Sequence, residues 1–115
     1  MPKENGGFIL RIPKNTPITK LKQIIQNNLG VSLEWYRFST AKDSDGLGKF
    51  WRSTNETYII AAYYHPSKKH SAIANGGTNG GGLAKIPAKG GEWAVAYSKR
   101  GFFNTSIYAL SSLLE

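Results

Sequence analysis

Short runs of apolar residues, separated by polar stretches, dominate the pattern along this chain. Most runs are rich in β-branched and aromatic residues, which is typical of strands joined by turns. The run at 58–64 is almost continuously apolar, so we expect a central strand buried on both faces. In 93–97, large residues alternate with alanine, as in a strand whose two faces differ. The predicted strands span residues 7–12, 31–38, 49–52, 58–64 and 92–98.

Between the first two predicted strands, the apolar period changes to that of an amphipathic helix. Isoleucine and leucine residues recur there at i, i+3 and i+7, while lysine and glutamine fall largely outside this stripe. Thr16 is the expected N-cap ahead of Pro17, and Gly30 is the expected residue beyond the last turn. The spacing therefore predicts a helix over 17–29.

Three further segments complete the predicted fold. Residues 39–48 are mainly polar and predict a loop. Residues 76–91 contain seven of the thirteen glycines, which predicts a long glycine-rich loop at about 75–91 that includes a short extended piece at 83–86. Apolar residues at helical spacing over 106–114 predict a short C-terminal helix, with a last strand as the alternative. The fold class is therefore α+β, in which a mainly antiparallel sheet of four or five strands packs against the amphipathic helix.

The length and composition exclude several classes of protein. The 115 residues predict a single domain, 1–115. The chain contains no cysteine, which excludes disulfides, thiolate zinc sites, iron–sulfur clusters and a cysteine nucleophile. Neither a membrane-spanning run nor a signal-peptide pattern is visible, so we expect a cytoplasmic location and no membrane partner. We also expect no cofactor.

The charge balance favours a polyanionic partner. Fifteen Lys and Arg residues against seven Asp and Glu give a net charge of +8, and the pI is near 9.8. We expect RNA or single-stranded nucleic acid ahead of duplex DNA, because no helix has the basic face of a recognition helix. An acidic protein is the alternative partner. The candidate phosphate contacts are Lys68, Lys69, Lys85, Lys89, Lys99 and Arg100.

Aromatic residues near these charges predict stacking on unpaired bases. Most rings must nevertheless fill the core, because the chain contains one methionine and few leucines. We expect exposed rings at Trp51, Tyr64 and Phe102. We expect buried rings at Trp35, Tyr58 and Trp93.

The two histidines of the chain, His65 and His70, closely follow the strongest predicted strand and flank Lys68 and Lys69. Metal-independent RNA cleavage needs a base for the 2′-hydroxyl, an acid for the leaving oxygen and a cation at the phosphate, and histidine titrates near neutrality. His65 and His70 are therefore candidate catalytic residues. The alternative is an ordinary solvated loop, and no metal site is predicted because further ligands are remote.

The glycine-rich stretch does not match a phosphate-loop motif. Gly77 and Gly82 have the Walker A spacing, but Leu83 stands where that motif requires lysine. Two interpretations stay open, a flexible loop and a backbone nest for an anion.

The order of several features loosely resembles that of small bacterial ribonuclease toxin domains, including those similar to the EndoU class. These features are the two histidines, the glycines at 76–82, Lys99 and the segment 102–106. The two histidines are closer together here than in that class. The resemblance implies RNA cleavage by the histidines.

The leading hypothesis is a small basic domain that interacts with nucleic acid, with a metal-independent, toxin-like ribonuclease as its sharper form. Thr105 or Tyr108 would then supply a supporting hydrogen bond. The alternative hypothesis is a non-catalytic inhibitor or adaptor that binds an acidic protein partner, for example through an edge strand.

Overall fold

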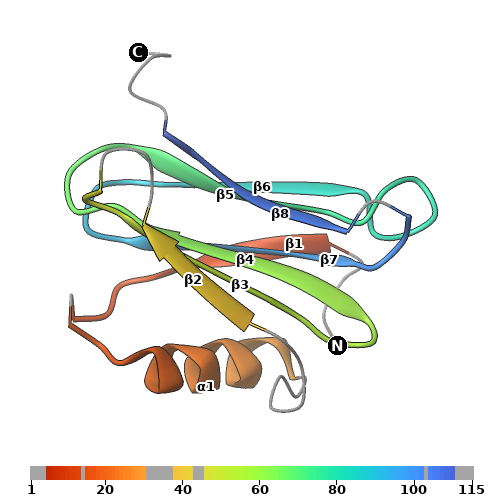
Figure 1. The fold of residues 1–115 in the computed structure, drawn as a ribbon, viewed down its shortest axis with the longest axis horizontal. Helices are drawn as coiled ribbons and strands as arrows, with labels where there is room; N and C mark the ends of the chain where they lie inside the picture. Colours follow the sequence, from red (N-terminus) through yellow and green to blue (C-terminus); the bar gives the residue numbers. More distant parts are fainter. Residues whose placement is uncertain (1–4, 14, 31–37, 43–45, 103, 111–115) are drawn as a thin grey trace.

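The computed structural model describes residues 5–13, 15–30, 38–42, 46–102 and 104–110. Within these residues, a helix covers one face of a five-stranded sheet, and a three-stranded sheet covers the other face (Figure 1). The elements are β1 (Asn5–Leu10), α1 (Ile18–Leu29), β2 (Phe38–Lys42), β3 (Lys49–Thr54), β4 (Tyr58–Tyr64), β5 (His70–Asn75), β6 (Leu83–Ala88), β7 (Trp93–Lys99) and β8 (Thr105–Leu110).

Both sheets are antiparallel throughout. The large sheet has the order β1-β7-β4-β3-β2, and the small sheet has the order β6-β5-β8. In the register of the large sheet, Tyr64 of β4 lies opposite Trp93 of β7 and opposite Lys49 of β3. The α+β class and the antiparallel sheet packed against the first helix are therefore confirmed, whereas the second sheet was not predicted.

Helix α1 is held on the large sheet by its apolar stripe. Leu21, Ile25 and Leu29 are buried against large side chains that alternate along β4 and β7, such as Ile60 and Val95. The helix starts one residue later than predicted, and Gly30 ends it in the left-handed conformation, with φ of 71°. The N-cap prediction was wrong, since Pro17 occupies that position and the Thr16 hydroxyl donates to the Pro13 carbonyl oxygen at 2.6 Å.

The two sheets pack closely because small residues line their interface. Alanine residues of β4, β5, β6 and β7 alternate inward there, and larger rings pack among them at Phe50, Tyr63 and Tyr108. A Cβ atom on Gly7 of β1 would overlap the Val95 carbonyl oxygen and the Ile86 side chain. The continuous apolar run over 58–64 therefore has the predicted cause, since β4 is buried under the helix on one face and under the small sheet on the other.

The predicted C-terminal helix was wrong. Residues Thr105–Leu110 form β8, which pairs with β5 along its whole length. Tyr108 and Leu110 pack between the sheets, while Ile107 points outward and is 46% exposed. Apolar positions at strand spacing and at helical spacing coincide over so short a segment, and pairing with β5 decides for the strand. Leu114 lies outside the described residues.

The glycine-rich loop is much shorter than predicted. Strand β5 extends to Asn75 and β6 occupies Leu83–Ala88, so the loop between them covers only 76–82. The predicted loop at 39–48 likewise contains most of β2. The predicted strand at 31–38 lies outside the described residues except for Phe38. No helix in the described part of the chain is long and apolar enough to cross a membrane.

Candidate basic end of the sandwich

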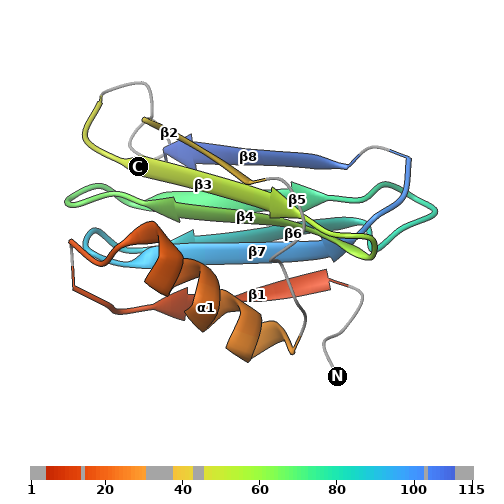
Figure 2. The same ribbon diagram turned by 60° about the horizontal axis from the view of Figure 1, so that its bottom comes forward.

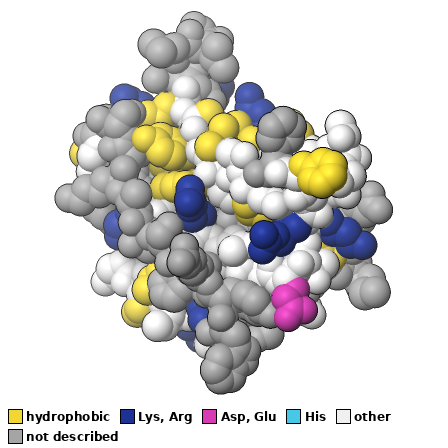
Figure 3. All heavy atoms as spheres, turned by 45° about the vertical axis from the view of Figure 1, so that its right-hand side comes forward, with side chains coloured by type: hydrophobic (Ala, Val, Ile, Leu, Met, Phe, Trp, Pro, Cys, Tyr) yellow, Lys and Arg dark blue, Asp and Glu magenta, His cyan; other side chains and the backbone are white. Residues whose placement is uncertain are grey.

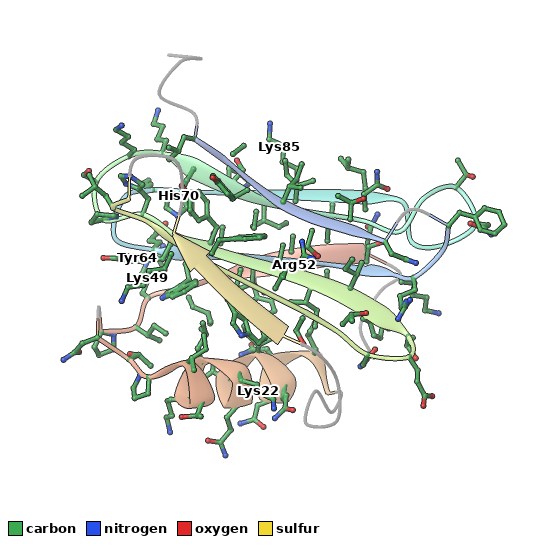
Figure 4. The ribbon with its side chains drawn as sticks, in the orientation of Figure 1. Lys22, Lys49, Arg52, Tyr64, His70 and Lys85 are labelled. Carbon is green, nitrogen blue, oxygen red and sulfur yellow. The ribbon has the colours of Figure 1, made fainter. Side chains whose placement is uncertain are left out.

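The two histidines lie in the interior, at one end of the sandwich. His65 directly follows β4 and His70 begins β5, and both side chains are fully buried. Figure 4 shows His70 close to Lys49 and Tyr64 at this end, away from Lys85 and Arg52. The alternative interpretation, in which these histidines stand on an ordinary solvated loop, is therefore wrong for both side chains. The polar residues between the two histidines gave no sign that the histidines are buried. The chain leaves the core for only one turn there, and both histidine rings remain inside.

The His65 ring organises this turn. Its Nδ1 atom accepts hydrogen bonds from the backbone N–H groups of Ser67 at 3.2 Å and Lys68 at 3.0 Å. Because Nδ1 accepts, a neutral ring carries its proton on Nε2. The His65 carbonyl oxygen also accepts from the Gly91 N–H at 2.7 Å, which joins the 65–69 turn to the 89–92 turn.

The His70 ring forms a second connection between the same two turns. Its Nδ1 lies 2.8 Å from the Lys68 carbonyl oxygen, and its Nε2 lies 2.8 Å from the Glu92 carbonyl oxygen. Both oxygens are acceptors, so a ring nitrogen that carries a proton donates to the carbonyl oxygen beside it. The Tyr63 ring packs edge-on against it, with centroids 5.1 Å apart. These contacts give both histidine rings a structural role, and their predicted roles as acid and base stay predictions.

The antiparallel topology separates the predicted nucleic-acid contacts into groups. Lys68, Lys69 and Lys89 lie at the histidine end, whereas Lys99 and Arg100 lie at the opposite end, where Lys99 is paired with Tyr58 at the start of β4. A seven-residue strand such as β4 spans roughly 20 Å. A single short site therefore cannot include both groups.

The remaining predicted site residues are also dispersed. Lys85 is exposed in the middle of β6, and Thr105 is exposed at the start of β8, near the Lys99 end. Tyr108 is half-buried and packs on the rings of Phe50 and Tyr63, with centroids 5.3 and 4.7 Å apart. Its ring therefore contributes to the core between the sheets.

Five basic side chains, which we call the basic end, come together around the histidine turns. Turns 65–69 and 89–92 lie side by side, and the register of β3 on β4 brings the first residue of β3 to the same end. The last strand residue of β1 is opposite the start of β7, so the following residue also reaches this end. The basic end consists of Arg11, Lys49, Lys68, Lys69 and Lys89. Arg11 and Lys49 were missed because only strand register brings them there.

Glu92 is the acidic residue of the basic end among the described residues, and its charge is already engaged. The Lys89 backbone N–H donates to Oε1 at 3.1 Å, and Arg11 Nε donates to Oε2 at 2.7 Å. The Lys89 N–H, followed by Arg11, holds the pKa of Glu92 below its ordinary value of 4.5. The carboxylate thus fixes the 89–92 turn and positions Arg11.

The lowered pKa of Glu92 predicts a pH dependence of stability. A depressed pKa in the folded state stabilises the protein above the unfolded value, and this stabilisation is lost as the pH falls through the folded value. We therefore expect Glu92→Gln to lower the free energy of unfolding at neutral pH but to have little effect at strongly acidic pH. Arg11→Gln leaves the Lys89 hydrogen bond and should have a smaller effect. Urea unfolding across pH measures this, and parallel wild-type and Glu92→Gln profiles would contradict it.

The aromatic residues at the basic end are covered. Tyr64 is only 6% exposed and packs against Trp93, with centroids 5.6 Å apart. Trp51 is 1% exposed. The predictions that Tyr64 and Trp51 lie at the surface were wrong, whereas the burial of Tyr58 and Trp93 and the exposure of Phe102 are confirmed. Trp35 lies outside the described residues. Phe102 is 85% exposed at the opposite end, so base stacking there would be remote from the basic end.

The glycine-rich loop uses its backbone N–H groups internally. Gly76 donates to the Gly82 carbonyl oxygen at 3.0 Å, while Gly80 and Gly82 both donate to the Gly77 carbonyl oxygen at 3.1 Å. Gly81 donates to the Lys99 carbonyl oxygen at 2.9 Å. These groups are therefore not directed together at an external anion. The loop is a compact connection that packs on the end of β7.

Comparisons with protein-family models, curated proteins and solved structures found no match for this chain. The site combines buried histidines that brace two turns with basic side chains around them.

Proposed function

We propose that this domain binds RNA or other single-stranded nucleic acid through the basic end. The observation that carries the proposal is the convergence of five basic side chains from four separate segments on one end of the sandwich. Within the described residues, the acidic group at this end, Glu92, is already bonded to Arg11 and to the 89–92 turn. A phosphate backbone supplies the repeated negative charges that such a surface can neutralise.

The buried histidines support binding rather than cleavage. A general acid or base must come within hydrogen-bonding reach of the reacting proton. Both rings are inaccessible in this conformation, and their bonds to Ser67, Lys68 and Glu92 hold the backbone that carries the lysines. The proposed activity is therefore binding, in which the histidines set the shape of the basic end.

Removal of two basic-end lysines is expected to weaken nucleic-acid binding and to flatten its salt dependence. Lys49 and Lys89 are exposed and come from different segments. Each lost phosphate contact should reduce the slope of log K against log salt by about 0.7 for a single strand. We expect Lys49→Gln/Lys89→Gln to reduce the slope by about 1.4 and the affinity at low salt by roughly tenfold. Fluorescence anisotropy with a labelled single-stranded RNA across a salt series measures both quantities.

The matched control removes two exposed lysines elsewhere, one on α1 and one on β6. Lys20→Gln/Lys85→Gln has the same net charge as the test variant and should retain most of the affinity and slope. Equal losses in both double variants would show that only overall charge matters, which would contradict a site at the basic end. Absence of binding by the wild-type protein at low salt would refute the proposal. RNA products formed in EDTA would show cleavage, an activity beyond the proposed one.

A further inference from the structure

The small sheet is narrower than the large sheet and covers only part of it. Strands β6, β5 and β8 lie over β1, β7 and β4, and β8 is the edge nearest to β3. Figures 1 and 2 show β8 beside β5 on one side and approaching the β2–β3 side of the molecule on the other. The described parts of β3 and β2 therefore extend beyond the small sheet, and the next strand position beside β8 lies over β3.

Strand β8 has the properties of an edge that can accept another strand. Among the described strands it pairs with β5 alone. Its six residues, TSIYAL, include no charge, proline or glycine, although such residues commonly protect an edge from pairing. The opposite edge, β6, contains Lys85 and Pro87 and packs against β1. Ser106 also holds β8 in place, since its hydroxyl donates to the Ile60 carbonyl oxygen at 3.2 Å.

The surface beside β8 combines apolar and basic groups. Phe50 of β3 contacts Tyr108 of β8, with ring centroids 5.3 Å apart. Arg52 follows two positions after Phe50 on the same side of β3 and is exposed. At the end of β3, Arg100 Nη1 donates to the Thr54 hydroxyl at 3.3 Å. Figure 3 shows a face on which, among the described residues, hydrophobic and basic side chains are more widespread than acidic ones.

Charge complementarity identifies the chemistry of the occupant. Strands β3 and β8 contain basic and neutral residues and no aspartate or glutamate. A second copy of this chain would bring another net charge of +8 and a second Arg52 to the same junction. An acidic strand would instead direct a carboxylate to Arg52 from its inward face, while its apolar side chains on the outward face contact Ile107. Strand addition of this kind obtains affinity from backbone hydrogen bonds and specificity from alternate side chains.

We propose that an extended acidic segment of a partner protein adds beside β8 as a fourth strand of the small sheet, with a carboxylate paired to Arg52. This interaction uses a surface different from the basic end and does not depend on nucleic-acid binding.

The test uses a short peptide that alternates valine with glutamate and the full-length protein. NMR titration should shift the backbone amide signals of β8 and give the dissociation constant. Reversal of one contacting charge is expected to weaken binding roughly tenfold in Arg52→Glu. Lys20→Glu makes the same charge change on the exposed face of α1 and should alter the affinity by less than about twofold. A peptide with lysine in place of glutamate should not bind detectably.

A second pair of variants tests pairing at the edge. Ile107→Glu places a negative charge on β8 that repels the glutamate side chains of the peptide, and it is expected to abolish binding. Leu83→Glu makes the same change at a 59% exposed position on β6 and should bind as wild type does. Circular dichroism checks that each variant is folded. Equal binding by Arg52→Glu and wild type, amide shifts centred on Lys49 and Lys89, or self-association through β8 would each overturn the proposal.

Discussion

His70→Ala is expected to lower the melting temperature of the protein by roughly 10 °C or more. The imidazole is fully buried and lies 2.8 Å from each of two carbonyl oxygens, which belong to Lys68 and Glu92. Alanine would leave a cavity beside Tyr63 and would remove the partner of both oxygens. Loss of buried packing together with unsatisfied polar groups typically costs about 2–4 kcal/mol. Calorimetry and urea unfolding measure the loss.

Lys89→Ala is the matched control, because its side chain is exposed on the turn that His70 holds. We expect its melting temperature to stay within about 2 °C of the wild-type value, as for most surface substitutions. The same His70 variant separates a structural from a catalytic role. If His70 were only catalytic, His70→Ala would abolish RNA cleavage and leave the melting temperature unchanged. That result would contradict the structural role of His70 in joining the two turns.

Nitrogen-15 NMR of the histidine rings provides a direct check of the His70 contacts. The position of the N–H signal would show which ring nitrogen donates, Nδ1 to the Lys68 carbonyl oxygen or Nε2 to the Glu92 carbonyl oxygen. Slow exchange of the ring N–H proton with solvent is also expected, because the ring is buried. Rapid exchange of this proton would contradict the closed arrangement of the two turns.

Local patterns in the sequence were sufficient to predict the central elements of the fold. The helical stripe, the left-handed Gly30 and the continuous apolar run of β4 can each be recognised from the residues of one segment. Segments whose structure depends on pairing were predicted less well. Strand β8 is short, and its apolar positions fit both a helix and a strand. Its strand conformation depends on pairing with β5, which lies far away in the sequence.

The site was harder to predict because proximity along the chain is a poor guide to proximity in an antiparallel sandwich. His65, Lys68 and Lys89 were found as candidates and do lie at one end. Lys49 and Arg11 join them only through the registers of β3 on β4 and of β1 on β7. Burial of the two histidines could not be inferred from their polar neighbours, because their rings fold back onto backbone groups of the two turns.

The opposite end provides the second large expected effect, through Gly76→Ala. A Cβ atom on Gly76 would overlap the Lys99 carbonyl oxygen and would lie 2.9 Å from the Ser98 hydroxyl. Gly101 also lies close to this loop, since a Cβ atom on Gly101 would overlap the Gly76 carbonyl oxygen. The obstacles are largely backbone atoms within a hydrogen-bonded loop, so they cannot move aside independently. We expect a loss of about 3 kcal/mol in the free energy of unfolding, at the upper end of ordinary overpacking.

Gly91→Ala separates this overlap from conformational strain. Gly91 has φ of +88°, but a Cβ atom at this position would meet nothing within 4 Å beyond its chain neighbours, so its substitution should cost only about 1 kcal/mol. Urea unfolding of both variants gives the comparison, and equal losses would contradict close crossing of the two loops. The folded Gly76→Ala variant also tests the proposed function, because its change lies beside Lys99 and far from the basic end. We therefore expect the RNA affinity of this variant to be nearly unchanged at temperatures below its unfolding transition. A loss of RNA affinity would instead indicate that the binding surface lies at the end that carries Lys99 and Arg100.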